Sequence, residues 1–284
     1  MLNTLTIDVE DYYMVSAFAN RIKFEDWHKF ESRVEKNTYI LLDLLDLYGV
    51  RATFFILGWV AEQHPGLVKE IDRRGHELAS HGYNHRLVYE LTPQEFREDT
   101  RKSKGIIEDI AGKPVIGYRA TSFSITERSI WALDILIEEG LLYDSSIFPI
   151  RHDRYGMPNA ERFPHPIRLN GRTLIEFPPS TYSIFGCHIP IAGGGYLRLF
   201  PGWFTNWAIR RLNENEGQPA VIYIHPWEID TDQPRLNAKF LSRIRHYANI
   251  NSTEAKLKTL IERFRFRPIS YFLNTQETII HAQK

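Results

Sequence analysis

Two histidines spaced four residues apart, His81 and His85, are the part of the sequence best suited to hold a metal ion. They lie in a Ser-His-Gly-Tyr-Asn-His run after the candidate strand 77–80, and from a tight loop both imidazoles can reach one cation. With 11 histidines in 284 residues, such a pair can also be a pair of surface or loop-anchoring histidines. Its position favours a metal site, because active-site groups of parallel α/β folds gather at the carboxyl ends of the strands.

A segment rich in carboxylates, containing Asp8, Glu10 and Asp11, stands at the end of the first candidate strand, residues 5–9. If a cation binds, one carboxylate can complete a site of two histidines and one carboxylate, while another remains free as a general base. Such a site keeps an open position for water and substrate. The alternative is that these side chains cap the amino-terminus of a following helix.

Two further residues have the chemistry of a hydrolytic site. Arg119 follows the candidate strand 115–118 and could orient a carboxylate through a forked ion pair; the alternative is a surface arginine. His225 closes the apolar strand 220–224, a position from which it could protonate a leaving amine; the alternative is a buried structural histidine.

The elements that must position these residues alternate between short β-branched or aromatic runs and longer amphipathic segments, which predicts a parallel sheet with crossover helices. The Thr92-Pro93-Gln94-Glu95 run predicts a capping box that opens a helix running toward Gly112. Residues 149–166 are expected to form a long ordered loop and residues 178–201 a second irregular stretch, and long loops in a compact domain usually carry function. The candidate strands are 5–9, 52–57, 77–80, 115–118, 174–177, 220–224 and 269–272.

The composition restricts the class of ligand. Lys+Arg and Asp+Glu both total 35, so no overall field favours nucleic acid or an anionic membrane surface, and a neutral substrate is expected. The single cysteine, Cys187, excludes an intramolecular disulfide framework. The sequence shows no membrane span and no secretory leader pattern, so a cytoplasmic protein of one domain is expected; the oligomeric state stays open.

In this order and at these strand ends, the segments from Thr6 to about Trp227 resemble the polysaccharide deacetylase family, the family 4 carbohydrate esterases. The resemblance implies an irregular (β/α) barrel of about seven strands. It also implies removal of acetyl groups from an N-acetylated saccharide, with a divalent metal, for which zinc is expected. The implied residues are the base Asp8, the metal ligands His81 and His85, the base-tethering Arg119, a backbone N–H near Ser122 for the oxyanion, the pocket wall around Asp144 and the general acid His225.

This chain departs from the usual pattern of that family at two places. The common Thr-Phe-Asp-Asp run is replaced by Thr-Ile-Asp-Val-Glu-Asp, so the acidic metal ligand is either Glu10 or Asp11, and alignment with Asp-x-Asp members favours Glu10. Thr121 stands where the family usually has proline, which bears on the rigidity of the oxyanion loop. The later segments resemble a bacterial subgroup associated with exopolysaccharide assembly, whose C-terminal extension residues 231–284 would match.

Aromatic residues near the motifs could stack on a sugar ring, since saccharides usually pack on aromatic faces. Phe123, Tyr196 and Trp227 are the candidates, and core packing is the alternative for each. Two other functions stay open. The same catalytic set could hydrolyse a small cyclic or linear amide, or the scaffold could bind sugar without turnover.

Overall fold

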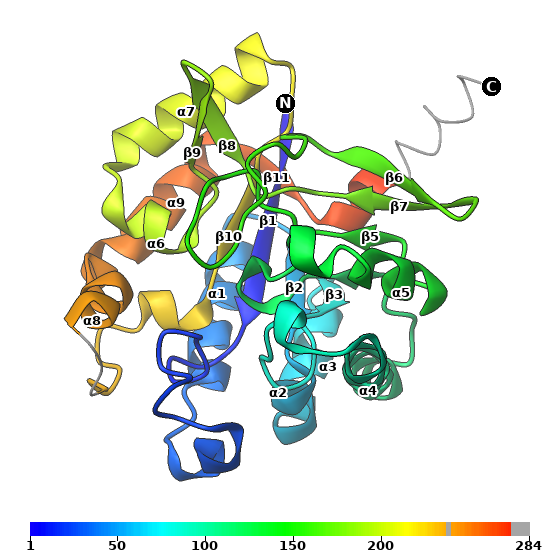
Figure 1. Cartoon of the computed structure of the whole chain (residues 1–284). Helices are drawn as coiled ribbons and strands as arrows, with labels where there is room; N and C mark the ends of the chain where they lie inside the picture. The colour runs from blue at the N-terminus through cyan, green and yellow to red at the C-terminus, as the bar shows by residue number, and fades with distance from the viewer. Residues whose placement is uncertain (237–239, 274–284) are drawn as a thin grey trace.

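The computed structural model describes residues 1–236 and 240–273, and a mostly parallel sheet covered by helices is its framework (Figure 1). The strands of this sheet are β1 (Leu2–Val9), β2 (Thr53–Ile56), β3 (Glu77–Ser80), β4 (Gly117–Tyr118), β5 (Tyr143–Asp144), β6 (His165–Leu169), β7 (Arg172–Glu176), β10 (Val221–Ile224) and β11 (Arg265–Arg267). Their order is β10-β1-β2-β3-β4-β5-β7-β6, and β11 pairs with the start of β1. The β6–β7 pair is antiparallel and the others are parallel. The carboxyl ends of the parallel strands therefore meet at one edge.

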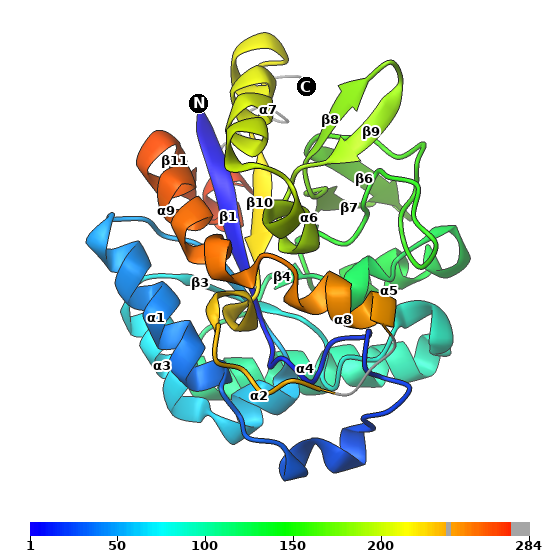
Figure 2. The same ribbon diagram turned by 90° about the vertical axis from the view of Figure 1, so that its left-hand side faces the viewer.

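The crossovers between the parallel strands are helical, as the sequence pattern predicts, except that β5 leads to the β6–β7 pair through the loop 145–164. The helices are α1 (Val34–Leu47), α2 (Gly58–Gln63), α3 (Pro65–Arg73), α4 (Pro93–Ala111), α5 (Ala132–Glu138), α6 (Gly194–Leu199), α7 (Gly202–Asn215), α8 (Phe240–Tyr247) and α9 (Thr253–Arg263). The predicted capping box at Thr92 is present, and α4 ends at Gly112 in the left-handed conformation. Seen from two directions, α8 lies beside the irregular segment that follows β1 (Figures 1 and 2).

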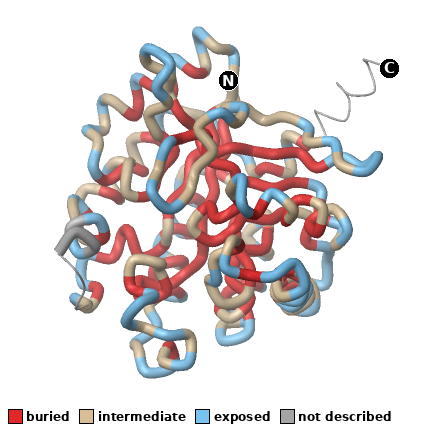
Figure 3. The backbone as a smooth tube through the Cα atoms, viewed as in Figure 1, coloured by how far each residue is buried: buried red, intermediate tan, exposed pale blue. Residues whose placement is uncertain are grey.

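The central strands are buried along both faces, as expected for a parallel sheet covered on each side (Figure 3). Successive side chains of β1 point to opposite faces of the sheet and therefore contact different partners. Leu5, Ile7 and Val9 belong to the main hydrophobic core. Thr6 and Asp8 instead both bond to Arg119 on the inner side. One strand thus packs the core with one face and presents polar groups with the other.

The predicted α/β architecture is confirmed, but closure of a barrel is not seen in the described residues. Between β7 and β10, single residues bridge the gap. The Ser180 N–H donates to the Val221 carbonyl at 3.1 Å, and Gly193 forms an isolated parallel bridge with Tyr223. A Cβ on Gly193 would lie 1.7 Å from the Tyr223 carbonyl oxygen, so this contact requires glycine.

Two sequence-based assignments were wrong. The strand expected at residues 269–272 is not formed; residues 269–273 are helical, and the strand lies earlier, at β11. The stretch 178–201, expected to be irregular, contains a hairpin of β8 (Thr181–Ile184) and β9 (Cys187–Pro190) followed by α6. None of the helices in residues 1–236 and 240–273 is long and apolar enough to cross a membrane.

Candidate active site

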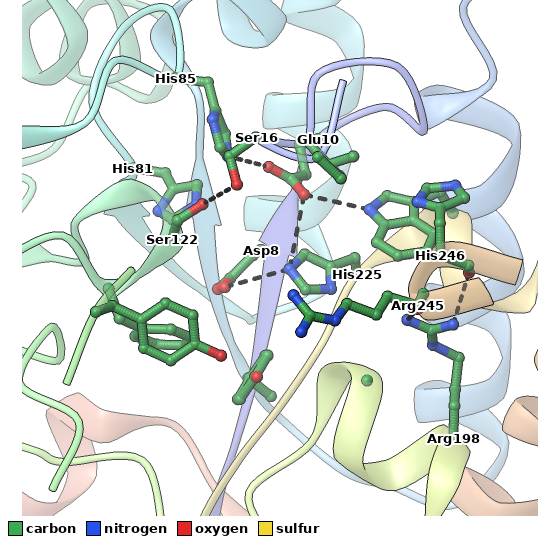
Figure 4. Close-up of a pocket in the computed structure, with 17 residues that line it drawn as sticks. Asp8, Glu10, Ser16, His81, His85, Ser122, Arg198, His225, Arg245 and His246 are labelled. Carbon is green, nitrogen blue, oxygen red and sulfur yellow. Dashed lines mark hydrogen bonds and ion pairs between the residues drawn. The ribbon is translucent and has the colours of Figure 1, made fainter. Parts of the chain in front are cut away.

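A pocket of about 200 Å³ opens at the carboxyl ends of β1, β3 and β10 (Figure 4). Its lining brings together eight of the residues selected from the sequence, although they are separated by up to 219 positions: Asp8, Glu10, His81, His85, Ser122, Phe123, His225 and Trp227. The other four, Asp11, Arg119, Asp144 and Tyr196, do not line this pocket. Parallel topology accounts for the gathering, because each lining motif begins where a strand ends.

Glu10, His81 and His85 form a compact group of metal-binding side chains. Their ligand atoms all lie within 4.8 Å of one another, and His85 Nε2 is 2.8 Å from Glu10 Oε2. His81 Nδ1 lies 2.7 Å from the Arg119 carbonyl oxygen, so Nδ1 carries the proton and Nε2 keeps a free lone pair. Burial lowers the pKa of His81 to about 4, which leaves its imidazole neutral. Two imidazoles and one carboxylate are a donor set suited to a divalent transition metal, with positions left open.

Asp11 lies outside this group because its carboxylate has another role. Its oxygens accept hydrogen bonds from the backbone N–H groups of Arg33 and Val34 and from the Ser32 hydroxyl, at 2.8 to 3.2 Å. The two backbone N–H groups are among the donors at the amino-terminus of α1 that have no partner within the helix. The geometry thus brings Glu10, and not Asp11, to the two histidines, and gives Asp11 the capping role that sequence reasoning had set aside.

Asp8 is held by a fully buried arginine. The Arg119 Nη1 donates to Asp8 Oδ1 at 2.7 Å and to the Thr6 hydroxyl at 2.7 Å, and Arg119 itself is 0% exposed. Its Nε and Nη2 donate to the carbonyl and the hydroxyl of Ser145, respectively. With all three nitrogens of the guanidinium bonded, one oxygen of Asp8 is fixed and the other, Oδ2, faces His225 at 3.8 Å.

His225 stands opposite Asp8 and is oriented by an acidic residue that the sequence analysis missed. Its Nδ1 lies 2.9 Å from Glu228 Oε2, and Glu228 is in turn bound by Arg198 Nε at 2.7 Å. The His225 Nε2 points into the pocket, 3.6 Å from Glu10 Oε1. Burial by itself lowers the pKa of His225. The negative charges of Glu228 and Glu10 outweigh burial and raise the pKa to about 9.

The turn that carries Ser122 is strained. Ser122 and Phe123 have φ values of 51° and 53°, a left-handed backbone that non-glycine residues rarely adopt. Thr121 supplies an anchor that proline could not, because its hydroxyl donates to the Arg86 carbonyl at 2.8 Å. Such strain is retained where the surroundings hold it, and here it brings Ser122 to the pocket wall.

Asp144 lies beneath this turn and pairs with a second buried carboxyl, Glu176. The Ser146 hydroxyl donates to Asp144 Oδ1 at 2.5 Å and accepts from the Ala120 N–H at 2.7 Å. Burial, followed by the Asp144 charge, raises the pKa of Glu176 well above its usual range, and burial raises that of Asp144 to about 6. Burial and mutual repulsion therefore favour the protonated form of Glu176 beside Asp144. Asp144 supports the active-site turn from below and does not contact the pocket.

We expect Glu176→Gln to flatten the pH dependence of stability. Both carboxyls have raised pKa values in the folded protein, so the stability that their protonated forms contribute is fully present below their ordinary pKa values of 3.8 and 4.5. That stability is lost as pH rises through about 6 for Asp144 and through a higher pH for Glu176. A glutamine amide keeps the donor without ionising, so the variant should be more stable at pH 8 by about 1–3 kcal/mol. Urea unfolding between pH 4 and 8 measures this, with the exposed Glu214→Gln as control; equal slopes for wild type and Glu176→Gln would contradict it.

Of the candidate stacking residues, Trp227 has the closest tie to the site: its indole N–H donates to Glu10 Oε1 at 3.2 Å, and its ring stacks on His246 at 4.2 Å. Phe123 lines the pocket. Tyr196 lies one layer behind, with its hydroxyl 3.5 Å from that of Tyr155, which does line it.

Sequence reasoning missed nine of the lining residues: Val15, Ser16, Ala17, Tyr155, Gly195, Arg198, Tyr223, Arg245 and His246. The first three follow β1, Tyr155 lies in the loop 149–166, and the others come from the part of the chain after β9. Glu228 was detectable, since its three-residue spacing from His225 is that of a capping box, which is present at Pro226–Ile229.

Comparison with known proteins agrees with this arrangement. Residues 22–136 match the family described as Polysaccharide deacetylase. Peptidoglycan deacetylase of Helicobacter pylori is 33% identical over 107 residues, which are 38% of this chain and 36% of that protein. The first four curated relatives are matched over only 26% to 36% of their length.

Solved structures share the fold at low identity. A protein of Mycobacterium smegmatis assigned as a polysaccharide deacetylase aligns with a TM-score of 0.61 and 22% identity, over 96% of this chain and 89% of that one. PuuE allantoinase aligns with a TM-score of 0.61 and 15% identity, over 95% and 87%.

Residues 22–136 belong to the polysaccharide deacetylase family, the family 4 carbohydrate esterases, as the motifs predicted, and the curated relatives agree. The later part of the chain matches a different family model. Residues 145–274 match a second family, described as Domain of unknown function (DUF3473), which supplies β6 to β11, His225 and α8.

Proposed function

We propose that this protein is a metal-dependent hydrolase that removes the acetyl group from an N-acetylated saccharide, with zinc as its cation. One observation carries the proposal: a cluster of Glu10, His81 and His85 shares one pocket with an arginine-held aspartate and a glutamate-held histidine. A divalent cation bound by the cluster would supply Lewis-acid polarisation of the acetamide carbonyl and would favour ionisation of water.

The side chains around the pocket have complementary roles. Asp8, fixed through Oδ1, takes the proton of the attacking water on Oδ2. The strained turn at Ser122 presents a backbone N–H to the developing oxyanion, a contribution of roughly 3–4 kcal/mol per donor in such sites. His225, whose Nε2 faces the pocket, delivers a proton to the departing amine. The products are acetate and a free amino sugar.

The test is acetate release by the full chain after removal of metals and reloading with zinc. We expect turnover of an N-acetylhexosamine oligomer by the zinc-loaded protein and none by the metal-free protein. Glu10→Gln should lose zinc binding in titration calorimetry, whereas Asp11→Asn should keep it and lose stability instead. Absence of acetate from every N-acetylated saccharide, at full zinc occupancy, would overturn the proposal. Hydrolysis of a cyclic amide alone would favour the small-amide alternative on the same scaffold.

Glu228 is a positioning residue for His225, and Glu228→Gln should lower kcat by about 10²-fold or more with little change in KM, because the imidazole loses its correct tautomer and aim. Glu228→Asp should recover part of the loss. Glu216→Gln is the matched control, since Glu216 also binds an arginine, Arg162, at 2.7 Å but lies outside the pocket. A parallel loss in both glutamine variants would assign Glu228 a merely structural role.

The finer parts of the proposal concern the biological role of the protein, its C-terminal segment and its location in the cell. The resemblance of the later motifs to a bacterial subgroup associated with exopolysaccharide assembly supports a role in exopolysaccharide biosynthesis. We also propose that residues 231–284 form an extension packed on a single catalytic domain, which the pairing of β11 with β1 supports; residues 237–239 and 274–284 lie outside the described residues. The cytoplasmic location stays a prediction that cell fractionation can test.

A further inference from the structure

Arg245, on α8, lines the candidate active site without an acidic partner. Among the described residues, no carboxylate lies within ion-pair distance of its guanidinium, and its side chain reaches into the pocket (Figure 4). The other two arginines at the site are neutralised: Arg119 binds Asp8 and Arg198 binds Glu228. Arg245 therefore places an uncompensated positive charge on the pocket wall.

The backbone that carries Arg245 is anchored to the catalytic wall. The buried Arg198 guanidinium, bound to Glu228, also donates to the carbonyls of Arg245 at 2.9 Å and His246 at 2.6 Å. The His246 ring is fixed as well, between the Trp227 ring and the Gln233 amide. The backbone of Arg245 is thus tied to the same network that orients His225, and its exposed side chain extends from that backbone to line the pocket.

Two tyrosine hydroxyls lie near this charge. Tyr155 lines the pocket, and its hydroxyl is 3.5 Å from that of Tyr196. Arg245 and Tyr155 both line this pocket. Burial raises the pKa of both tyrosines; the negative charge of Asp153 acts in the same direction and the positive charge of Arg245 in the opposite one. A guanidinium beside two protonated phenols offers hydrogen-bond donors to an anion.

We propose that Arg245 and Tyr155 form an anion subsite, so that the substrate is an N-acetylated sugar that also carries a carboxylate or a phosphate group close to the acetamido-bearing ring. The proposal rests on the deacetylase function proposed above and is an alternative to the neutral substrate expected from overall charge. A uronic acid carboxylate and an anomeric phosphate both present anionic oxygens that a guanidinium can bind through two parallel hydrogen bonds.

The test compares three probes built on one ring: N-acetylglucosamine, N-acetylglucosaminuronic acid and N-acetylglucosamine 1-phosphate. Titration calorimetry with the full chain measures their affinities independently of turnover. We expect at least one anionic probe to bind more tightly than the neutral sugar, and the tighter probe identifies the anion as carboxylate or phosphate. Arg245→Gln should reduce this preference by about 10- to 100-fold, and Arg245→Lys should reduce it less.

Arg243→Gln is the matched control, because Arg243 lies on the same helix, is exposed and does not line the pocket; it should keep the preference. Equal affinities of the three probes for the wild type, or an unchanged preference in Arg245→Gln, would overturn the anion subsite. Acetate release without an anionic preference refutes the subsite alone. An anionic preference without acetate release refutes the deacetylase proposal and leaves the subsite standing.

Discussion

Asp8→Asn should lower kcat for acetate release by about 10²- to 10⁴-fold, with KM within a few-fold of the wild-type value. The asparagine oxygen can still accept the hydrogen bond of Arg119, so the side chain keeps its aim, but an amide cannot take a proton from water. Since Asp8 acts on the water and not on the bound sugar, the loss should fall on the chemical step.

Steady-state kinetics at a temperature well below the unfolding midpoint measure this effect. Asp26→Asn is a suitable control, because Asp26 is an exposed carboxylate paired with Lys29 on the surface. A kcat within about threefold of the wild type would remove Asp8 from its role as general base and would leave the Arg119–Asp8 pair with a structural function only.

Arg119→Met should cost about 3–5 kcal/mol of folding stability, besides abolishing turnover. The guanidinium is 0% exposed, bonds to Asp8, Thr6 and Ser145, and lies over the Phe55 ring at 4.2 Å. Removing it leaves the buried Asp8 carboxylate without its counter-charge, which is far more costly than losing a surface pair.

A double-mutant cycle isolates that pairwise energy. In Asp8→Asn/Arg119→Met, no charge remains unpaired, so the loss of stability should be smaller than the sum of the two single losses. Urea unfolding of the four proteins gives the coupling energy. Arg210→Met, which removes an exposed arginine 4.0 Å from Glu214, should change stability by no more than about 0.5 kcal/mol. Additive losses at Asp8 and Arg119 would show that the pair does not act as a unit.

The gathering of the site was predictable because it follows from topology. Histidines 81 and 85, Arg119 and His225 each follow a strand, and parallel strands bring their carboxyl ends to one edge. The choice between Glu10 and Asp11 was also within reach of sequence reasoning. Side chains two residues apart in a strand point to the same face, so Glu10 shares the face of Asp8, whereas Asp11 does not.

Other features depended on tertiary packing that no local pattern encodes. Arg198 and Arg245 reach the pocket because α6 and α8 pack on the wall formed by Trp227 and Glu228, and neither helix carries a recognisable motif. The hairpin of β8 and β9 lies within residues 178–201, whose proline and glycine residues are typical of an irregular stretch. The gap between β7 and β10 is bridged by single hydrogen bonds, which a strand pattern cannot distinguish from a closed barrel.

The alternation of side chains along β1 has a consequence for how this segment can change in length. Thr6 and Asp8 occupy one face, Glu10 follows directly after the strand, and Leu5, Ile7 and Val9 occupy the other face. Inserting or deleting one residue upstream, within the pairing with β10, would exchange the two sets, turning carboxylates toward the apolar core and leucine and valine toward the pocket. Substitutions within β1 can have mild or severe effects, one side chain at a time. A shift of a single residue would disable the general base, the metal-binding cluster and the core packing together.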